Sequence, residues 1–119
     1  MSLKLNKNEN QTYWIEVEGG WFEIAPMSLS EESRMRKQFT RMKRGQEEID
    51  TTALMKARFN RVVKNWKDIE LNHNTNPECN QENKNYIVEW FTDVATEVLI
   101  QANDIRDENE KVEDENLGE

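Results

Sequence analysis

The chain has 119 residues, of which 35% are hydrophobic and 34% are charged, and its formal net charge is −8. This length is typical of one domain, and the composition is polar for a globular protein. The single cysteine excludes an internal disulfide. No apolar run approaches the about 20 residues that a membrane span needs, and the N-terminus lacks the apolar stretch of a secretory signal peptide. We therefore expect a cytoplasmic protein without a membrane partner.

Two short segments rich in aromatic and β-branched residues, 13–18 and 21–24, flank a Gly-Gly pair near the N-terminus. This arrangement predicts a small β-hairpin over about residues 12–25. Apolar residues stand at adjacent positions in both segments, so they point to both faces of the hairpin. Because a lone hairpin is only marginally stable in water, one face is expected to pack on the helices. The other face has no obvious cover.

A capping box predicts the first helix, since Ser28 is followed three residues later by Glu31. The helix is expected over about residues 29–44, and Gly45 is a typical residue for its end. Its apolar stripe is thin and consists of Met35, Phe39 and Met42.

A second helix, capped by Asp50 or Thr51, is expected to reach about residue 67. Four of its apolar residues have helical spacing, namely Met55, Phe59, Val62 and Trp66. A polar loop over residues 72–83 follows. The third helical region spans about residues 83–105, either as one helix or as two helices divided near Thr92 and Asp93, since either residue can cap a new turn.

The C-terminal end is strongly acidic, with eight acidic and two basic residues over positions 104–119. Almost without apolar side chains, it cannot offset its ordering entropy. We therefore expect a disordered acidic tail over residues 106–119, which aids solubility or, alternatively, acts in docking or repulsion. The predicted fold is mainly α, of the α+β class. It consists of one domain over residues 1–105, with a small N-terminal β-hairpin followed by three to four helices.

Six basic residues without an intervening acid fall within eleven positions, and they are Arg34, Arg36, Lys37, Arg41, Lys43 and Arg44. On one helix they would form a positive face. Such a face is either a solvated or protein-docking surface or a contact for nucleic-acid phosphates. Acidic residues on both sides of the run and the missing helix-turn-helix signature favour the first interpretation.

Few residues suit catalysis or metal binding. His73 and Cys79 are the only residues of their kinds, whereas zinc needs three or four ligands. Glutamates on both sides of Cys79 do not favour a reactive thiolate. The glycines form no phosphate-binding loop. We predict no enzyme, no metal site and no cofactor, although a pocket joining carboxylates with His73 would revive an enzymatic alternative.

The four tryptophans divide into two pairs. Trp66 and Trp90 are expected in the core, whereas Trp14 and Trp21 on the two-faced hairpin are equally suited to core and interface. The residues that we expect to contact a protein partner are Trp14, Trp21, Phe22, Met35 and Phe39.

The second half of the chain has an ordered series of features. The residues that define it are Arg58, Val62-Val63, Lys64-Asn65-Trp66-Lys67-Asp68-Ile69, Glu82-Asn83 and Tyr86-Ile87-Val88. In this series, residues 58–105 resemble the tail assembly chaperones of long-tailed phages and prophages. The N-terminal half is similar to the family only in layout. The loop Asn76-Pro77-Glu78-Cys79-Asn80 stands where many members carry an acidic residue, a glycine and a proline.

The resemblance implies a non-enzymatic protein in the cytoplasm of a bacterial host. Family members bind the tape-measure protein, and in some systems the tail tube subunit, and keep them soluble until the tube polymerises. Many also have a longer product made by frameshifting near the end of the gene. The alternative is a small nucleic-acid-binding regulator that uses the segment from Arg34 to Arg44. The sequence leaves self-association open.

Overall fold

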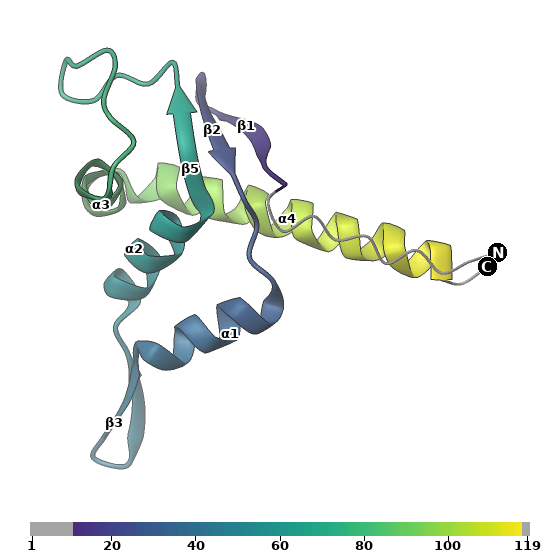
Figure 1. The fold of residues 1–119 in the computed structure, drawn as a ribbon. Coiled ribbons are helices and arrows are strands. Elements are labelled where there is room, and N and C mark those ends of the chain that lie inside the picture. The colour runs from purple at the N-terminus through teal and green to yellow at the C-terminus, as the bar shows by residue number, and fades with distance from the viewer. Residues whose placement is uncertain (1–10, 118–119) are drawn as a thin grey trace.

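Three antiparallel strands form the main sheet, in the order β1-β2-β5 (Figure 1). The computed structural model describes residues 11–117, with side chains to Asn109. The elements in chain order are β1 (Tyr13–Val17), β2 (Gly20–Ile24), α1 (Leu29–Gln38), β3 (Thr40–Lys43), β4 (Gln46–Ile49), α2 (Thr51–Val62), β5 (Val63–Lys67), α3 (Gln81–Trp90) and α4 (Thr92–Leu117).

The predicted N-terminal hairpin is confirmed, with its turn one residue earlier than the Gly-Gly pair. Glu18 and Gly19 join β1 to β2, and their φ values are +50° and +89°. Two-residue turns with positive φ at both positions match the twist of the flanking strands. Gly20 belongs to β2, where an added Cβ would lie 3.1 Å from Ile69 Cγ1. The missing side chain therefore lets the segment after β5 lie close to the turn.

The third strand shows that the predicted helix to residue 67 is wrong beyond Val62. The chain passes directly from α2 into β5, where Val63 and Trp66 pair with Ile24 and Phe22 of β2. The apolar spacing of this segment fits a helix, but pairing with β2 satisfies its backbone groups as a strand. Two consecutive β-branched valines at the junction also favour the extended backbone.

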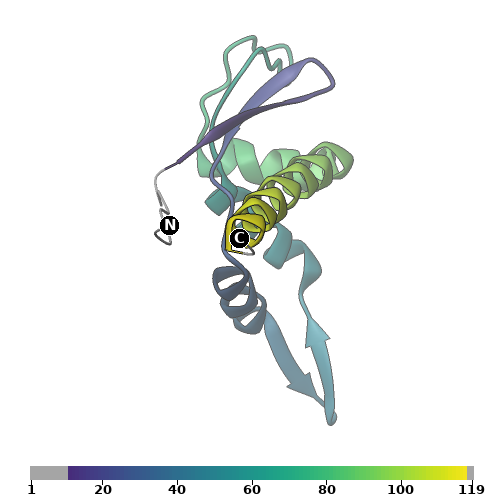
Figure 2. The same cartoon turned by 90° about the vertical axis from the view of Figure 1, so that its right-hand side faces the viewer.

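A second hairpin, which we name the arm, consists of β3, β4 and the turn Arg44–Gly45. It shows that the predicted helix to residue 44 is wrong beyond Gln38. The Thr40 hydroxyl donates to the Arg36 carbonyl at 2.8 Å, which closes the helix end. Gly45, predicted as the helix end, instead occupies the turn with φ +78°. In Figure 2 the arm extends away from the main sheet and from α4.

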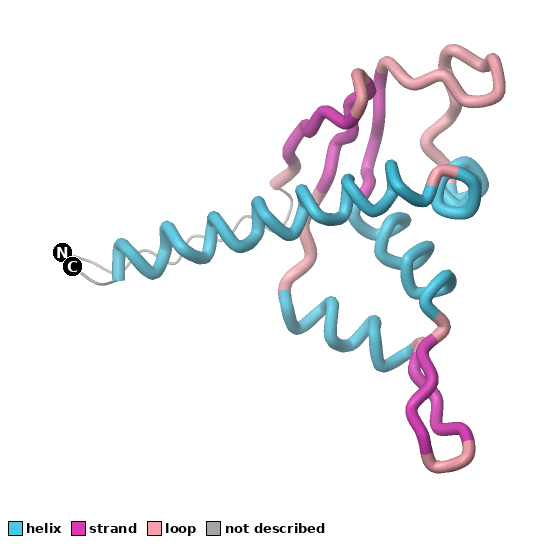
Figure 3. Tube along the Cα trace, turned by 180° about the vertical axis from the view of Figure 1, so that it is seen from behind, coloured by secondary structure: helices cyan, strands magenta, loops and turns pink. Residues whose placement is uncertain are grey.

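The last helical region is divided at Phe91, next to the predicted break. Asn80 caps α3 by accepting from the Asn83 N–H at 2.9 Å, and the Phe91 N–H donates to the Ile87 carbonyl at 2.8 Å. Helix α4 then begins at Thr92. In Figure 3, α3 is seen nearly end-on while α4 runs across the picture, so the two axes diverge sharply.

Helix α4 continues to Leu117, so its backbone covers most of the expected disordered tail. The Arg106 side chain, only 12% exposed, donates to the Glu32 carboxylate at 2.8 Å. Asn109 donates to the Tyr13 hydroxyl at 2.9 Å. The prediction of disorder is therefore wrong for residues 106–109, because these contacts tie them to α1 and β1. Residues 118–119 lie outside the described part.

The core lies between one face of the main sheet and helices α2, α3 and α4. Its largest fully buried side chains are Phe59, Ile24, Val62, Val63 and Val98. Trp66 is buried as predicted, and its indole N–H donates to the Pro77 carbonyl at 2.8 Å. The α+β class, the N-terminal hairpin and the helix count agree with the prediction. The third strand and the arm do not.

Ionic contacts position α1, which has no buried residue. Its first turn carries Glu31 and Glu32. Arg61 of α2 binds both carboxylate oxygens of Glu31. Glu32 lies 3.4 Å from Arg58 of α2 and 2.8 Å from Arg106 of α4. These five residues, which we name the ion-pair cluster, join three helices that are distant in the sequence.

Candidate protein-binding surfaces

The described residues cover the main sheet on one side only. Side chains alternate along its strands, so Ile15, Phe22 and Trp66 enter the core while their neighbours point outward. In Figure 2 the helices lie on one side of the sheet. We name the opposite side the outer face, and its residues are Trp14, Glu16, Trp21, Glu23, Asn65 and Lys67. The predicted two-faced hairpin is thus found, with one face open.

Two tryptophans and a lysine form the centre of the outer face. The Lys67 ammonium lies 4.7 Å from the centre of the Trp14 ring and 5.7 Å from that of the Trp21 ring. Trp14 is 40% exposed and Trp21 is partly buried. Cation–π contacts of this kind hold the rings in place. The outer face therefore presents an aromatic surface, and neither Trp14 nor Trp21 belongs to the core.

The other three expected partner-contact residues differ in exposure. Phe22 is 2% exposed and packs edge-on against Phe59 and Trp66, with ring centres 6.4 and 6.3 Å apart. It belongs to the core and not to the outer face, so its contact with a partner stays a prediction. Met35 and Phe39 are partly buried at α1 and its C-cap, and Met35 packs against the core.

The basic run does not form one helical face. Arg34, Arg36 and Lys37 lie on α1, whereas Arg41, Lys43 and Arg44 lie on the arm. All six are exposed. Of these six basic residues, only Arg41 has an ion-pair partner within the described part of the chain, Glu48 at 3.6 Å. The predicted basic helix is therefore corrected to a basic helix end followed by a charged hairpin.

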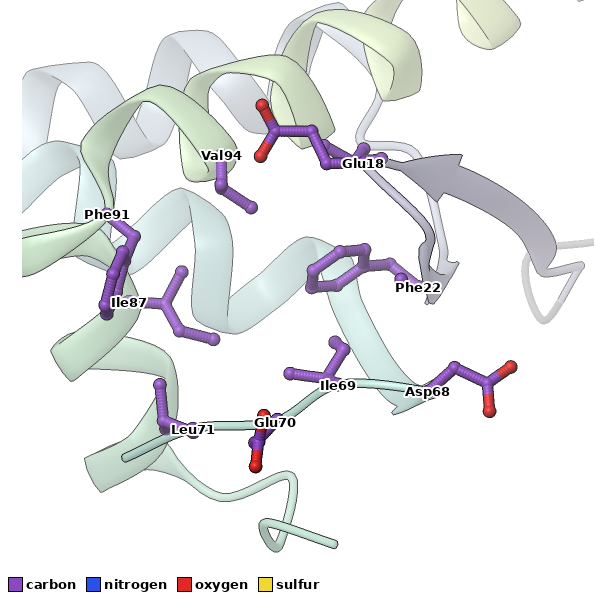
Figure 4. A pocket seen from close by; sticks show the side chains of 11 residues that line it. Glu18, Phe22, Asp68, Ile69, Glu70, Leu71, Ile87, Phe91 and Val94 are labelled. Atoms are coloured by element: carbon purple, nitrogen blue, oxygen red, sulfur yellow. The ribbon is translucent and has the colours of Figure 1, made fainter. Parts of the chain in front are cut away.

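An apolar groove lies where the turn end of the main sheet meets α3 and α4 (Figure 4). Its volume is about 210 Å³. Its apolar lining includes Phe22, Ile69, Leu71, Ile87, Phe91 and Val94, and its acidic residues are Glu18, Asp68 and Glu70. We name this feature the acidic groove.

Exposed aromatic residues adjoin the acidic groove. Phe91 in its lining is 45% exposed, and Trp90 beside it is 69% exposed. The Tyr86 ring lies 6.3 Å from that of Trp90 and 6.2 Å from that of Phe91, measured between ring centres. The prediction of Trp90 as a core residue is wrong, because α3 ends there and the chain changes direction. The predicted break near Thr92 was the signal that the apolar face would not continue.

The loop residues His73 and Cys79 differ in their surroundings. Burial raises the pKa of the Cys79 thiol, and the positive charge of Lys84 only partly opposes this shift. His73 is exposed and lies in the left-handed region with φ +70°. Within residues 11–117, no group of three or more His, Cys, Asp or Glu residues is placed to hold a metal ion. None of the described helices combines the length and apolar character of a membrane span.

Comparisons with known proteins assign no family to this chain. Comparison of the chain with protein-family models, curated proteins and solved structures gives no match. The function is therefore inferred from the surfaces of this molecule and from the resemblance of residues 58–105.

Proposed function

We propose that this chain is a non-enzymatic tail assembly chaperone of a long-tailed phage or prophage. It binds the tape-measure protein or the tail tube subunit in the bacterial cytoplasm and keeps it soluble before assembly. The observation that carries the proposal is the outer face, with Trp14 and Trp21 ordered around Lys67 and no described element covering them. Tryptophan is strongly enriched among the residues that dominate binding energy at interfaces.

The outer face suits a protein partner for a physical reason. Its aromatic rings stand on a sheet that is anchored through the opposite face, so binding orders few additional groups. Trp14 still has 40% of its surface exposed, which a partner would remove from water. Glu16 and Glu23 stand beside the rings and provide a polar rim.

The resemblance of residues 58–105 supports the proposal through the core. Val62, Trp66 and Ile87, which belong to the resembling series, are buried. The residues that carry the resemblance therefore form part of the core, whereas the proposed contact surface lies mainly on the N-terminal hairpin. Proteins with the same core could thus carry different residues on the outer face and bind different partners.

Co-expression with the tape-measure product of the same genome tests the proposal. We expect the soluble fraction of that product to rise and the two proteins to elute together. Separate elution with unchanged solubility would refute the proposal. The same assay with the tail tube subunit identifies which client is bound.

Variants place the contact on the outer face. The double substitution of Trp14→Ala and Trp21→Ala is expected to abolish co-elution while circular dichroism remains that of the wild type. Leu29→Ala and Met42→Ala serve as matched controls, because both side chains are exposed apolar residues outside the outer face. If the controls and the double variant weaken co-elution equally, the outer face is not the contact.

The rival function is nucleic-acid binding by the basic run. It is favoured by one observation, the exposure of all six basic side chains on α1 and the arm. A protein that makes about six phosphate contacts loses roughly 10³-fold in DNA affinity between low and physiological salt. Titration of duplex DNA at increasing salt tests this. No binding at low salt would refute the rival function.

A further inference from the structure

We propose that the acidic groove binds an apolar side chain on a basic segment of a partner protein. The inference is separate from the outer face and holds whichever client the chain has. It depends on three features of the groove, namely its volume, its exposed aromatic residues and its carboxylates, which have no ion-pair partner among residues 11–109.

The volume suits one side chain. A cavity of about 150 Å³ holds a benzene ring, and the groove measures about 210 Å³. One aromatic or branched aliphatic side chain therefore fits. Figure 4 shows Phe22, Ile69 and Ile87 directed toward the space that it would occupy. Such a side chain would exchange water for apolar contacts on several sides.

The rim of the groove already presents apolar surface to water. Phe91 is 45% exposed and Trp90 is 69% exposed, and Tyr86 packs against both. Adjacent exposed aromatic side chains mark interaction sites more often than scattered ones. A segment seated in the groove would cover Phe91 and extend over Trp90.

The charge of the groove selects a basic partner. Glu18, Asp68 and Glu70 belong to its lining, which contains no lysine or arginine. Within residues 11–109, none of these three carboxylates has an ion-pair partner. Lys67, next to Asp68, is held over the tryptophans of the outer face. Lysine or arginine residues around the anchoring side chain would therefore find complementary charge.

The arm of a second copy fits this description poorly. Met42 is its exposed apolar side chain, and it stands opposite Glu47 in the hairpin. Arg41 and Lys43 alternate with Met42 and so lie on the other face of the arm. Arg41 is also paired with Glu48. The arm thus presents no apolar anchor surrounded by bases.

Two synthetic peptides test the inference. Both are amphipathic helices of about 18 residues with leucine on one face, and the polar face carries lysine in one and glutamate in the other. We expect the lysine peptide to shift the methyl NMR signals of Ile69, Ile87 and Val94, and the glutamate peptide to leave them unchanged. Shifts confined to other methyl groups, or equal shifts with both peptides, would overturn the proposal.

Charge variants test whether the lysine peptide binds the carboxylates of the groove or responds only to the net negative charge of the protein. The triple variant Glu18→Gln, Asp68→Asn and Glu70→Gln is expected to weaken the lysine peptide at least about tenfold, or about 1.4 kcal/mol. The matched triple variant Glu47→Gln, Asp104→Asn and Glu108→Gln removes the same charge from exposed residues outside the groove. It is expected to change the affinity less than about twofold, since distant charges are screened. Equal effects of the two triples would overturn the proposal.

Aromatic variants provide the second control. Phe91→Ala is expected to weaken the lysine peptide about tenfold, whereas Leu29→Ala leaves its affinity unchanged, although both side chains are exposed and apolar. A lysine peptide with alanine in place of its central leucines tests the anchor without altering the protein, and we expect it not to bind. Sedimentation of the protein alone tests whether a second copy of the chain occupies the groove. Self-association that the groove triple abolishes would assign the groove to a second copy and overturn the proposal.

Discussion

Arg61→Ala should destabilise the fold by detaching the start of α1. Arg61 donates to both carboxylate oxygens of Glu31 and, through Nη1, to the Ala25 carbonyl at 3.1 Å. A buried hydrogen bond with a charged partner contributes roughly 1.5–3 kcal/mol. The side chains of Arg61 and Glu31 are 29% and 32% exposed, so solvent screening reduces these values. We expect a net loss of about 2 kcal/mol in the free energy of unfolding.

Urea unfolding followed by tryptophan fluorescence measures this loss. With a slope of about 1.5 kcal/mol/M, the midpoint should fall by roughly 1–1.5 M. Arg61→Lys should recover less than half of the loss, because a lysine cannot bind both oxygens of the carboxylate in one plane. Arg34→Ala is the matched control, since Arg34 is exposed on α1 and has no ion-pair partner among the described residues.

A double-mutant cycle with Glu31→Gln isolates the pair. Glutamine keeps the backbone N–H that donates to the Ser28 hydroxyl, so the helix cap remains. We expect a coupling energy of about 1 kcal/mol that decreases at high salt. A coupling below about 0.3 kcal/mol would mean that apolar contacts, and not the ion-pair cluster, hold α1.

Two further predictions concern the loop after β5. Trp66→Phe keeps an aromatic ring but leaves the buried Pro77 carbonyl without its hydrogen-bond donor. The same urea titration should therefore show a loss of about 2 kcal/mol in the free energy of unfolding. An unchanged midpoint would mean that this hydrogen bond does not stabilise the fold. Burial raises the pKa of the Cys79 thiol. At mildly alkaline pH, a disulfide reagent should therefore react more slowly with the native protein than with the protein in urea. Equal rates would contradict the raised pKa. The linked stability is present below the unfolded-state pKa of the thiol and is lost as pH rises through the raised folded-state pKa.

Features that depend on neighbouring residues could be predicted from the sequence. The Ser28 hydroxyl accepts from the Glu31 N–H at 3.1 Å, as the capping box indicates. The Asp50 carboxylate accepts from the Ala53 N–H at 3.1 Å and begins α2. The N-terminal hairpin and the helix break at Phe91 are also found. All of these arise from contacts within a few residues along the chain.

Strand β5 and the arm could not be predicted in the same way. β5 exists because β2, about 40 residues earlier in the chain, provides its hydrogen-bond partners. The arm consists mainly of arginine, lysine, glutamine and glutamate, which favour helices as isolated residues. The only local indication of a hairpin in this segment is the turn Arg44–Gly45. Because glycine is equally typical of a helix end, this turn does not distinguish a hairpin from a helix. Arg41 and Glu48, paired across the strands at 3.6 Å, become neighbours only when the hairpin forms.

The proposed binding surface depends on the register of the main sheet. Trp21 and Phe22 are adjacent, so any register buries one and exposes the other. Phe22 faces the core because it pairs with Ile15 on one side and Trp66 on the other. The pairing of Phe22 with Ile15 follows from the two-residue turn after Val17, whereas a turn at the Gly-Gly pair would pair Phe22 with Val17 on the same face. Moving the turn would leave Phe22 on the core face, but it would pair Trp21 with Glu18 instead of Glu16. Trp14 would then lie two residues further along the sheet from Trp21 and Lys67. The turn at Glu18 and Gly19 therefore decides that the two tryptophans lie close together on the outer face.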